Sequence, residues 1–196
     1  MKIIVIGAAG TIGAAVAAAL EPGHEVVRAG RSGPVRVDLE DPASITALLD
    51  ATGPIDAIAC CAASAPMAPL TAPDDAFTRG LHGKLLGQVA LLRLALPHLR
   101  DGGSVTLTAG TFAPAMVGAA FGALVNGGLE AFVRAAALEL PRGLRVNAVS
   151  PGWVRETLLA LGWDGAAGTP AADVARAYVA AIEGKAQGQV FVPAAR

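Results

Sequence analysis

The chain has 196 residues, a length that fits one domain with a sizeable hydrophobic core. Hydrophobic residues make up 54% of it and charged residues only 16%, a composition that argues against disorder. The net charge of −1 and the lack of a basic run argue against a nucleic-acid partner. The two cysteines, Cys60 and Cys61, are adjacent and do not suggest a disulfide framework, so we expect a reduced, cytoplasmic setting.

The sequence predicts neither a signal peptide nor a membrane span. The apolar run after Met1 and Lys2 is too short for a secretory core and predicts a strand. The uncharged stretch 111–129 contains Pro114 and four glycines, and its purely apolar part is shorter than a span requires. We therefore expect no membrane partner and predict a buried or subunit-facing helix in this stretch.

Apolar, β-branched runs alternate with helical periods along the chain. Strands are predicted at residues 3–6, 25–28, 35–38, 56–60, 104–108, 145–149 and 189–192, and helices at 12–20, 42–51, 81–99, 122–140 and 170–182. Asp41-Pro42 and Thr169-Pro170 each offer an N-cap followed by proline at the first helical position. The alternation predicts an α/β fold, a doubly wound parallel sheet of about seven strands with helices on both faces.

A glycine-rich loop, GAAGTIG (Gly7–Gly13), follows the first predicted strand and opens the first helix. Gly7 can make the tight turn, Gly10 lets the backbone approach a phosphate, and Gly13 lets the helix pack closely on the sheet. The helix N-terminus supplies unpaired N–H groups and a positive dipole end. This loop predicts a dinucleotide-binding site.

The residues after the second predicted strand indicate which dinucleotide binds. A carboxylate there would bind the ribose 2′-hydroxyl of NAD(H) and repel the 2′-phosphate of NADP(H). The sequence instead has Arg31 and Ser32, a cation and a hydroxyl that suit a phosphate. It therefore favours NADP(H) over NAD(H).

Four further segments complete a recognisable pattern: VDLED (Val37–Asp41), DAIACCAA (Asp56–Ala63), KLLGQVALLRLALPHL (Lys84–Leu99) and RVNAVSPGWV (Arg145–Val154). With the glycine loop, they resemble the short-chain dehydrogenase/reductase family over nearly the whole chain. The resemblance implies one NAD(P)-binding Rossmann domain over residues 1–196, with a short substrate region at about 153–171. It implies further cofactor contacts at Thr11, Ile12, Asp38, Leu39, Cys61, Ala62, Ala63, Thr108, Asn126, Pro151, Gly152 and Val154.

The catalytic residues of that family are missing. The resemblance places its Tyr-x-x-x-Lys pair at Gly122 and Asn126, its serine at Ala109 or Gly110, and its asparagine at Lys84. Hydride transfer to a carbonyl leaves an oxygen that needs a proton, which neither glycine nor asparagine can donate. A positioned general acid contributes roughly 10²–10⁴ in rate, so this gap bears directly on activity.

Few residues can replace the missing groups. Lys84 is the catalytic candidate, as a cation near the substrate or a proton donor; alternatively it is structural and satisfies a helix bulge or a backbone carbonyl. Thr108 and Thr111 either bind a substrate oxygen or form local hydrogen bonds. The only tyrosine, Tyr178, is expected to pack in the last helix. We expect Cys60 and Cys61 to be small buried residues, and His82 and His98 to lie at the surface. Trp153 and Trp163 are expected to roof a small pocket. We expect no metal site.

Two hypotheses about function stay open. The first is an NADP(H)-dependent oxidoreductase that acts on a small carbonyl or alcohol substrate through an atypical active site. The second is a catalytically inactive dinucleotide-binding protein that acts as a sensor or regulatory partner. The predicted cofactor segments support both. The missing catalytic set favours the second and the family resemblance favours the first, and of the two we prefer the oxidoreductase.

Two predicted helices carry more apolar surface than one contact with the sheet would cover. They lie at Lys84–Leu99 and Phe112–Leu140, and Gly118 and Gly122 are expected four residues apart on one face of the second. A large apolar face left in water is unusual for a monomer. In the resembling family these two helices form the subunit interface, so we predict a homodimer or homotetramer.

Overall fold

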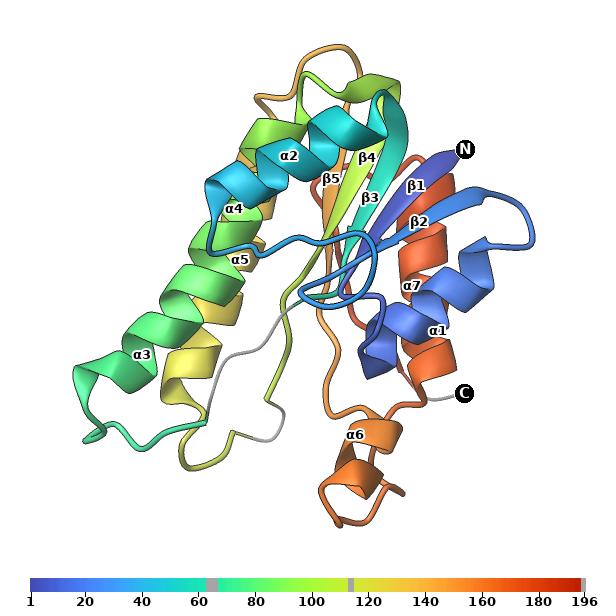
Figure 1. The fold of residues 1–196 in the computed structure, drawn as a ribbon. Coiled ribbons are helices and arrows are strands. Elements are labelled where there is room, and N and C mark those ends of the chain that lie inside the picture. The colour runs from blue at the N-terminus through green and yellow to red at the C-terminus, as the bar shows by residue number, and fades with distance from the viewer. Residues whose placement is uncertain (63–66, 113–114, 195–196) are drawn as a thin grey trace.

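The computed structural model of the protein describes residues 1–62, 67–112 and 115–194. In this part of the chain six parallel strands form one sheet in the order β2-β1-β3-β4-β5-β6 (Figure 1). The predicted doubly wound α/β fold is confirmed. The strands are β1 (Lys2–Ile6), β2 (Glu25–Ala29), β3 (Ile55–Cys60), β4 (Leu99–Thr108), β5 (Arg145–Val149) and β6 (Val190–Phe191).

Helices cover both faces of the sheet. Helices α1 and α7 lie on one face, and α2, α4 and α5 lie on the other (Figure 1). A short helix and a π-helix, α3 and η1, lead into α4, while α6 projects below the sheet ahead of α7. The bounds are α1 (Thr11–Leu20), α2 (Pro42–Thr52), α3 (Asp74–Gly80), η1 (Leu81–Leu86), α4 (Gly87–Ala95), α5 (Ala120–Ala136), α6 (Arg155–Ala160) and α7 (Ala171–Glu183).

The continuous apolar character of the strands follows from this double cover. Ile3 of β1 is buried in one core cluster together with residues of α1 and α7. The next residue, Ile4, is buried in a second cluster together with residues of α2, α4 and α5. Successive side chains of a strand point to opposite faces of the sheet. Both positions must therefore be apolar, and the strand loses the alternation of a half-exposed one.

The strand predicted at residues 35–38 does not form, so the sheet has six strands rather than about seven. The segment makes only an isolated bridge, between Gly30 and Arg36. Its two backbone hydrogen bonds with Gly30 run from Gly30 N to Val35 O at 3.1 Å and from Val37 N to Gly30 O at 2.9 Å. Pro34, directly before it, has no N–H to extend the ladder.

The long helix predicted at residues 81–99 is in fact three elements. Helical structure begins earlier, at Asp74, passes through the π-helix η1 and ends at Ala95. Pro97 cannot continue the helical hydrogen bonds, and Leu99 already belongs to β4. The prediction therefore placed both ends wrongly and missed the change of helix type.

Helix α5 also differs from its prediction. It runs from Ala120 to Ala136, and Gly118 lies before it in a left-handed conformation with φ of +86°. Gly118 and Gly122 therefore do not share one helix face, and the predicted small-residue packing surface is wrong.

The predicted N-caps have different outcomes. Asp41 caps α2, because the Ala43 N–H donates to its Oδ1 at 3.0 Å. Pro170 occupies the N-cap of α7, one residue later than predicted, and Thr169 does not cap it.

The fold brings the carboxyl ends of all six strands to one edge of the sheet. The strand order reverses at β1, which lies between β2 and β3. In open α/β sheets such a reversal leaves a crevice at the carboxyl ends, where ligands bind. Among the described residues, no helix combines the length and the hydropathy that crossing a membrane requires.

Candidate functional site

The glycine loop is tightly packed against its neighbours. Gly7 has φ of +81°, and a Cβ there would lie 2.7 Å from the Ala62 backbone nitrogen. A Cβ at Gly13 would lie 2.1 Å from the Gly7 carbonyl oxygen. Gly10 is the N-cap of α1 and makes no side-chain cap. The first N–H groups of α1 therefore remain available for an anionic ligand.

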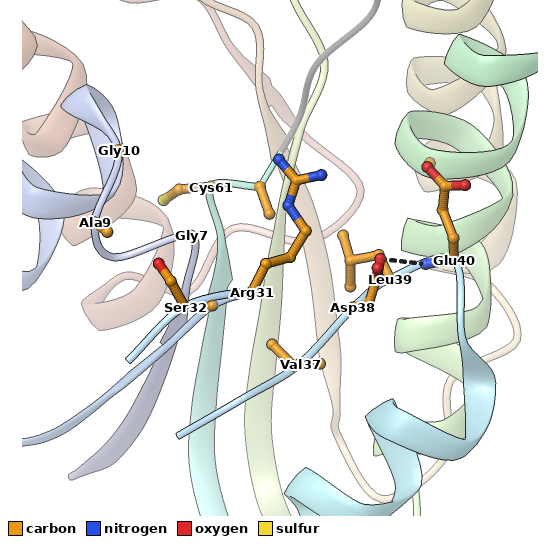
Figure 2. Close-up of a pocket in the computed structure, with 13 residues that line it drawn as sticks. Gly7, Ala9, Gly10, Arg31, Ser32, Val37, Asp38, Leu39, Glu40 and Cys61 are labelled. Atoms are coloured by element: carbon orange, nitrogen blue, oxygen red, sulfur yellow. Dashed lines mark hydrogen bonds between the residues drawn. The ribbon is translucent and has the colours of Figure 1, made fainter. Parts of the chain in front are cut away.

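A cavity of about 400 Å³ opens beside this loop (Figure 2). In Figure 2, Ser32 lies on the side of the glycine loop, Asp38 and Glu40 lie on the opposite side, and the Arg31 guanidinium stands between them. The cavity is lined by Gly7, Ala9, Gly10, Gly30, Arg31, Ser32, Val37, Asp38, Leu39, Glu40, Cys61, Ala62 and Gly83.

Charge in this first cavity is only partly paired. Arg31 makes no ion pair or hydrogen bond with the described residues and is exposed. Arg28, by contrast, is held by Glu21 at 2.7 Å, which raises the Arg28 pKa and lowers that of Glu21. The Asp38 Oδ1 accepts from the Glu40 N–H at 3.1 Å. Arg31 is thus the cation that a bound phosphate could recruit.

A second cavity, of about 280 Å³, lies where β4 and β5 end. Ile12 at the start of α1 lines it, so the two cavities flank the N-terminus of that helix. Its other lining residues are Met67, Lys84, Thr108, Ala109, Gly110, Thr111, Phe112, Asn126, Pro151, Gly152, Trp153, Val154 and Thr157.

Asn126 contributes an unpaired acceptor to this cavity. Its side chain is only 4% exposed, and its Oδ1 has no hydrogen bond with the described residues. Its amide nitrogen packs near Gly110, where a Cβ would lie 3.1 Å from it. Buried polar atoms are nearly always paired in folded proteins. The oxygen is therefore placed to accept a hydrogen bond from a ligand.

The ring of Phe112 occupies the space next to Gly122. A Cβ at Gly122 would lie 2.9 Å from the ring carbon Cε2 and 3.0 Å from Cζ. Phe112 belongs to the loop after β4. Its ring fills the space that a side chain at position 122 would otherwise enter. The expected serine position is equally bare, because Ala109 is buried and Gly110 has no side chain.

Lys84 lies in η1 and faces the second cavity with 8% of its surface exposed. Its ammonium group makes no hydrogen bond or ion pair with the described residues. Burial lowers the pKa of Lys84 to about 8. At neutral pH most molecules still carry a protonated Lys84, but the buried charge has lost part of its hydration, which costs free energy.

The backbone around Lys84 is satisfied by another residue. The buried amide of Gln88 donates to the Lys84 carbonyl at 2.7 Å and to the Thr108 carbonyl at 2.9 Å. Its oxygen accepts from the Thr108 N–H at 2.8 Å. Gln88 thus bonds both carbonyls, and the Lys84 ammonium does not make the carbonyl bond of the structural alternative with any described residue.

Thr108 and Tyr178 are engaged with each other. The Thr108 hydroxyl donates to the Cys60 carbonyl and also bonds the Tyr178 hydroxyl. Tyr178 is fully buried on α7, as predicted for a packing residue, and burial raises its pKa well above the usual value. Thr108 thus acts as a local hydrogen-bonding residue. Thr111 also lines the second cavity, and its hydroxyl has no partner among the described residues.

The cysteines and histidines are placed away from the chemistry. Burial raises the pKa of Cys60 to about 12 and also raises that of Cys61, so neither thiol is a ready nucleophile. Cys60 is buried as predicted, whereas Cys61 is half-buried and lines the first cavity. His82 is exposed and His98 is half-buried beside Asp50, at 3.7 Å.

The two tryptophans pack edge to face with ring centroids 5.4 Å apart. Trp153 lines the second cavity, while Trp163 is half exposed behind it and does not. The described residues contain no group of three or more potential metal ligands.

The predicted cofactor residues are gathered around the α1 N-terminus. Thr11 and Gly13 belong to α1 but line neither cavity, and Ala63 lies outside the described residues. The first cavity contains Gly7, Gly10, Arg31, Ser32, Asp38, Leu39, Cys61 and Ala62. The second contains Ile12, Thr108, Asn126, Pro151, Gly152 and Val154, together with Lys84.

Other residues of the site did not follow from the sequence patterns. Phe112 carried one usable signal, an aromatic residue just after the expected serine position and near a helix with glycine at the tyrosine position. Val37, Glu40 and Gln88 lie inside quoted segments, but no role was predicted for them. Gly83, Met67 and Thr157 approach the site only through folding.

Comparison with known proteins decides the family. A family model described as enoyl-(acyl carrier protein) reductase matches residues 12–183. The chain belongs to the short-chain dehydrogenase/reductase family. Family membership makes it a homologue of oxidoreductases and agrees with the doubly wound sheet. No curated protein shows significant similarity to the chain.

Solved structures match the chain almost end to end. The protein lin1944 from Listeria innocua is 40% identical, with a TM-score of 0.93 and 98% of each chain covered. A small-chain dehydrogenase in complex with NADPH is 25% identical, with a TM-score of 0.85, covering 98% of this chain and 95% of its own. A short-chain dehydrogenase from Mycobacterium smegmatis shares the fold, with 24% identity and a TM-score of 0.84. The match covers 100% of this chain and 92% of the Mycobacterium smegmatis chain.

Proposed function

We propose that the protein is an NADP(H)-dependent oxidoreductase that acts on a small carbonyl or alcohol substrate through an atypical active site. The observation that carries this proposal is the pair of cavities on either side of the α1 N-terminus. A dinucleotide has two nucleoside halves joined by a pyrophosphate, and helix N-termini bind phosphates. The first cavity would hold the adenosine half and the second the nicotinamide half.

The residues present fit such a cofactor. The glycine loop leaves no room for a Cβ at Gly7 or Gly13, and α1 offers uncapped N–H groups. The unpaired Asn126 oxygen would accept from a ribose hydroxyl. Arg31 and Ser32 would hold the 2′-phosphate that distinguishes NADP(H) from NAD(H). The NADPH in a similar small-chain dehydrogenase supports this choice.

Bound NADPH would supply a hydride to the substrate carbonyl. The chain would then have to stabilise the negative oxygen and deliver a proton to it. Among the described residues that line the second cavity, Lys84 is the one whose side chain titrates near neutral pH. Its ammonium would contact the carbonyl oxygen, stabilise the developing charge and donate the proton. The Thr111 hydroxyl would hold the same oxygen in place.

The second cavity suits a small substrate. It measures about 280 Å³, and the nicotinamide would take part of that volume. Trp153, Val154 and Thr157 close one side of it, so we assign residues 153–171 as the substrate region. We also place the protein in the cytoplasm, consistent with the two adjacent thiols.

One observation favours the alternative of a dinucleotide-binding sensor without catalysis. The ring of Phe112 fills the space next to Gly122, so no proton donor can act from there. On that alternative the cofactor segments would serve binding alone, and Lys84 would have no part in turnover.

The experiment that separates the two is a cofactor titration followed by a substrate panel. NADPH and NADH binding would be measured by calorimetry, and NADPH oxidation would then be followed with small aldehydes, ketones and an enoyl thioester. The proposal expects tighter NADPH binding and measurable oxidation with at least one small carbonyl. NADPH binding without turnover on any compound would support the sensor, and no binding of either dinucleotide would reject both.

A further inference from the structure

The described residues that line the second cavity carry a positive charge and no negative one. Lys84 is the charged side chain among the described residues that line it; the others are apolar, hydroxyl or amide side chains or glycines. The residues outside the described ranges, 63–66, 113–114 and 195–196, include no aspartate or glutamate. No carboxylate of the described residues pairs with the Lys84 ammonium.

An unpaired, largely buried ammonium is expensive to keep. Removing a charge from water costs several kcal/mol by order of magnitude unless a partner compensates it. The depressed pKa of Lys84 has burial as its sole cause, with no contribution from a neighbouring charge. An anionic group that enters the cavity would therefore gain a charge-assisted bond and restore the charge balance.

The phosphates of the cofactor are poor candidates for that anion. Their binding elements are the glycine loop, the α1 N-terminus and Arg31, and Gly7, Gly10 and Arg31 line the first cavity. Lys84 lines only the second cavity, beside Thr111 and Phe112. The missing negative charge is better supplied by the substrate.

We propose that the substrate is a short 2-oxo acid, or in the reverse direction the matching 2-hydroxy acid, and that Lys84 binds its carboxylate and its keto oxygen together. This inference rests on the proposed oxidoreductase function and names the substrate class for it. In a 2-oxo acid the two oxygens belong to adjacent carbons, so one ammonium with three N–H donors can reach both. An acid with the groups further apart would need a second cation, and none lines the cavity among the described residues.

The remaining walls fit the rest of such a molecule. Met67, Phe112 and Trp153 are apolar and would contact a short alkyl chain. The Thr111 hydroxyl would donate to the second carboxylate oxygen or to the keto oxygen. A long chain would not fit in the part of the roughly 280 Å³ cavity that the nicotinamide leaves free.

The reduction balances with these groups alone. The hydride from NADPH forms the new C–H bond at the keto carbon, and the π electrons of the C=O bond move to its oxygen. The Lys84 ammonium gives that oxygen a proton, which leaves a 2-hydroxy acid, NADP⁺ and a neutral lysine. Solvent then returns a proton to the amine. The carboxylate takes no part in bond changes and serves only to position the keto group.

Matched esters test the proposal by turnover. NADPH oxidation would be measured with pyruvate and 2-oxobutanoate, and with their methyl esters, which keep the keto group and lose the charge. We expect kcat/KM to be at least about tenfold higher for the acids, the range of one charge-assisted bond. Lys84→Met should abolish that preference. Lys185→Met, at an exposed lysine outside both cavities, should retain it.

Lys84→Arg separates the two roles of the side chain. Arginine keeps the charge but does not release a proton in this pH range. We therefore expect the acid-over-ester preference in KM to survive in Lys84→Arg while kcat falls. A Lys84→Arg variant that keeps both the acid-over-ester preference and the native kcat would overturn the assignment of Lys84 as the proton donor.

A binding readout keeps the test independent of catalysis. The chain has three lysines, Lys2, Lys84 and Lys185, so limited acetylation followed by mass spectrometry can follow each one. In the NADP⁺-loaded protein, pyruvate should slow acetylation of Lys84 at least about tenfold and leave Lys185 unchanged, whereas methyl pyruvate should have little effect.

Each outcome bears on a different statement. Protection of Lys84 by pyruvate without turnover would support the anion site and contradict the proposed oxidoreductase. Turnover of neutral carbonyls without preference for the acids would keep the oxidoreductase and overturn the 2-oxo acid. Full protection of Lys84 by NADP⁺ alone would also overturn it, because the cofactor would then be the missing anion.

Discussion

Lys84 combines a buried position with a charge that no described residue pairs, and this combination affects stability as well as binding. Its pKa is about 8 in the folded protein, whereas an unperturbed lysine side chain, as in the unfolded chain, has a pKa of 10.5. Below pH 8 both states are protonated, and the folded state carries the full burial cost. Between the two values the unfolded state binds more protons, so the contribution of Lys84 to the free energy of unfolding becomes less unfavourable as pH rises.

Lys84→Met should therefore raise the free energy of unfolding at pH 7, by at most about 3 kcal/mol on the scale of ~1.4 kcal/mol per pKa unit. The gain should shrink toward pH 10, where the native lysine is already neutral. Urea denaturation of both proteins at pH 7 and pH 10 measures the difference. Lys185→Met is the control, and a gain independent of pH would show that packing rather than charge is responsible.

Arg31 and Arg28 lie three residues apart and have different surroundings. Arg28 is paired with Glu21, whereas Arg31 lines the first cavity and pairs with none of the described residues. Arg31→Ala should narrow the difference in binding free energy between NADPH and NADH by about 1.5–3 kcal/mol, the range for bonds to charged groups. Calorimetry with both cofactors measures this. Arg28→Ala should leave the difference unchanged, and equal affinities in the native protein would reject the choice of NADP(H).

Phe112 and Gly122 are coupled because they share one space. Gly122→Tyr with Asn126→Lys, which introduces the family's catalytic pair, should lower the free energy of unfolding by about 1–3 kcal/mol, because the new side chain would overlap the Phe112 ring. Adding Phe112→Ala should recover much of this loss. The four proteins to compare are the native protein, the Phe112→Ala variant, the variant with the Tyr-Lys pair and the variant with all three changes. Their free energies of unfolding give the coupling energy, and additive effects would show that the Phe112 ring moves aside freely.

The same series can be assayed for turnover. Only the combination that has the tyrosine and lacks the phenylalanine ring should gain carbonyl reduction. A similar gain in the presence of Phe112 would mean that the loop after β4 adapts to the new side chain.

At the scale of elements, the strands were the easiest to predict. Residues such as Ile3 and Ile4 are buried on opposite faces, and this produces the uninterrupted apolar runs that the sequence displays. The segment 35–38 has the same local composition but no partner beyond Gly30. Strand pairing is a tertiary property, so composition alone could not reject that segment.

The helix before β4 shows the opposite limit. Its apolar period predicted a helix, but nothing in the composition of Leu81–Leu86 indicates a π-helix. The same holds for the site, where the glycine loop and the Pro151-Gly152 segment were evident from motifs. Phe112 lies outside the quoted segments, and Gln88 lies inside one that gave no sign of its role. Both reach the site only because β4, η1 and α5 converge there.

Gln88 ties α4 and η1 to β4 through three hydrogen bonds. Gln88→Leu would leave the Thr108 N–H and the Lys84 carbonyl without these partners in a buried setting. Each unpaired group costs about 1–3 kcal/mol, so the free energy of unfolding should fall by at least about 2 kcal/mol. Gln189→Leu, at an exposed glutamine, is the matched control. If the free energy of unfolding falls no further than in the control, the three Gln88 hydrogen bonds contribute little to stability.

At the scale of the whole molecule, the face formed by η1, α4 and α5 stays partly apolar. Leu86 is 47% exposed, Leu124 60% and Leu138, just after α5, 90%. This supports the predicted assembly through these helices, although the glycine pair at positions 118 and 122 does not contribute. We propose that two copies bury this face against each other, as a dimer or as half of a tetramer.

Light scattering at micromolar concentration should give at least twice the monomer mass of 19.5 kDa. Leu124→Glu would place a charge in the buried face and should shift the protein toward the monomer. Leu159→Glu, at an equally exposed leucine on α6, should not. A native protein that scatters as a monomer would refute the assembly.

The π-helix η1 has a consequence for how this protein can change. A π-helical turn contains more residues than the α-helical turn it replaces. Deleting Leu86 would let regular helical bonds close toward α4 and would rotate the preceding residues by about 100° around the helix axis. Lys84 would then turn away from the cavity while every side chain of its wall stayed the same. Substitution alters which group stands at position 84, but an insertion or deletion within the six residues of η1 decides whether that position faces the site at all.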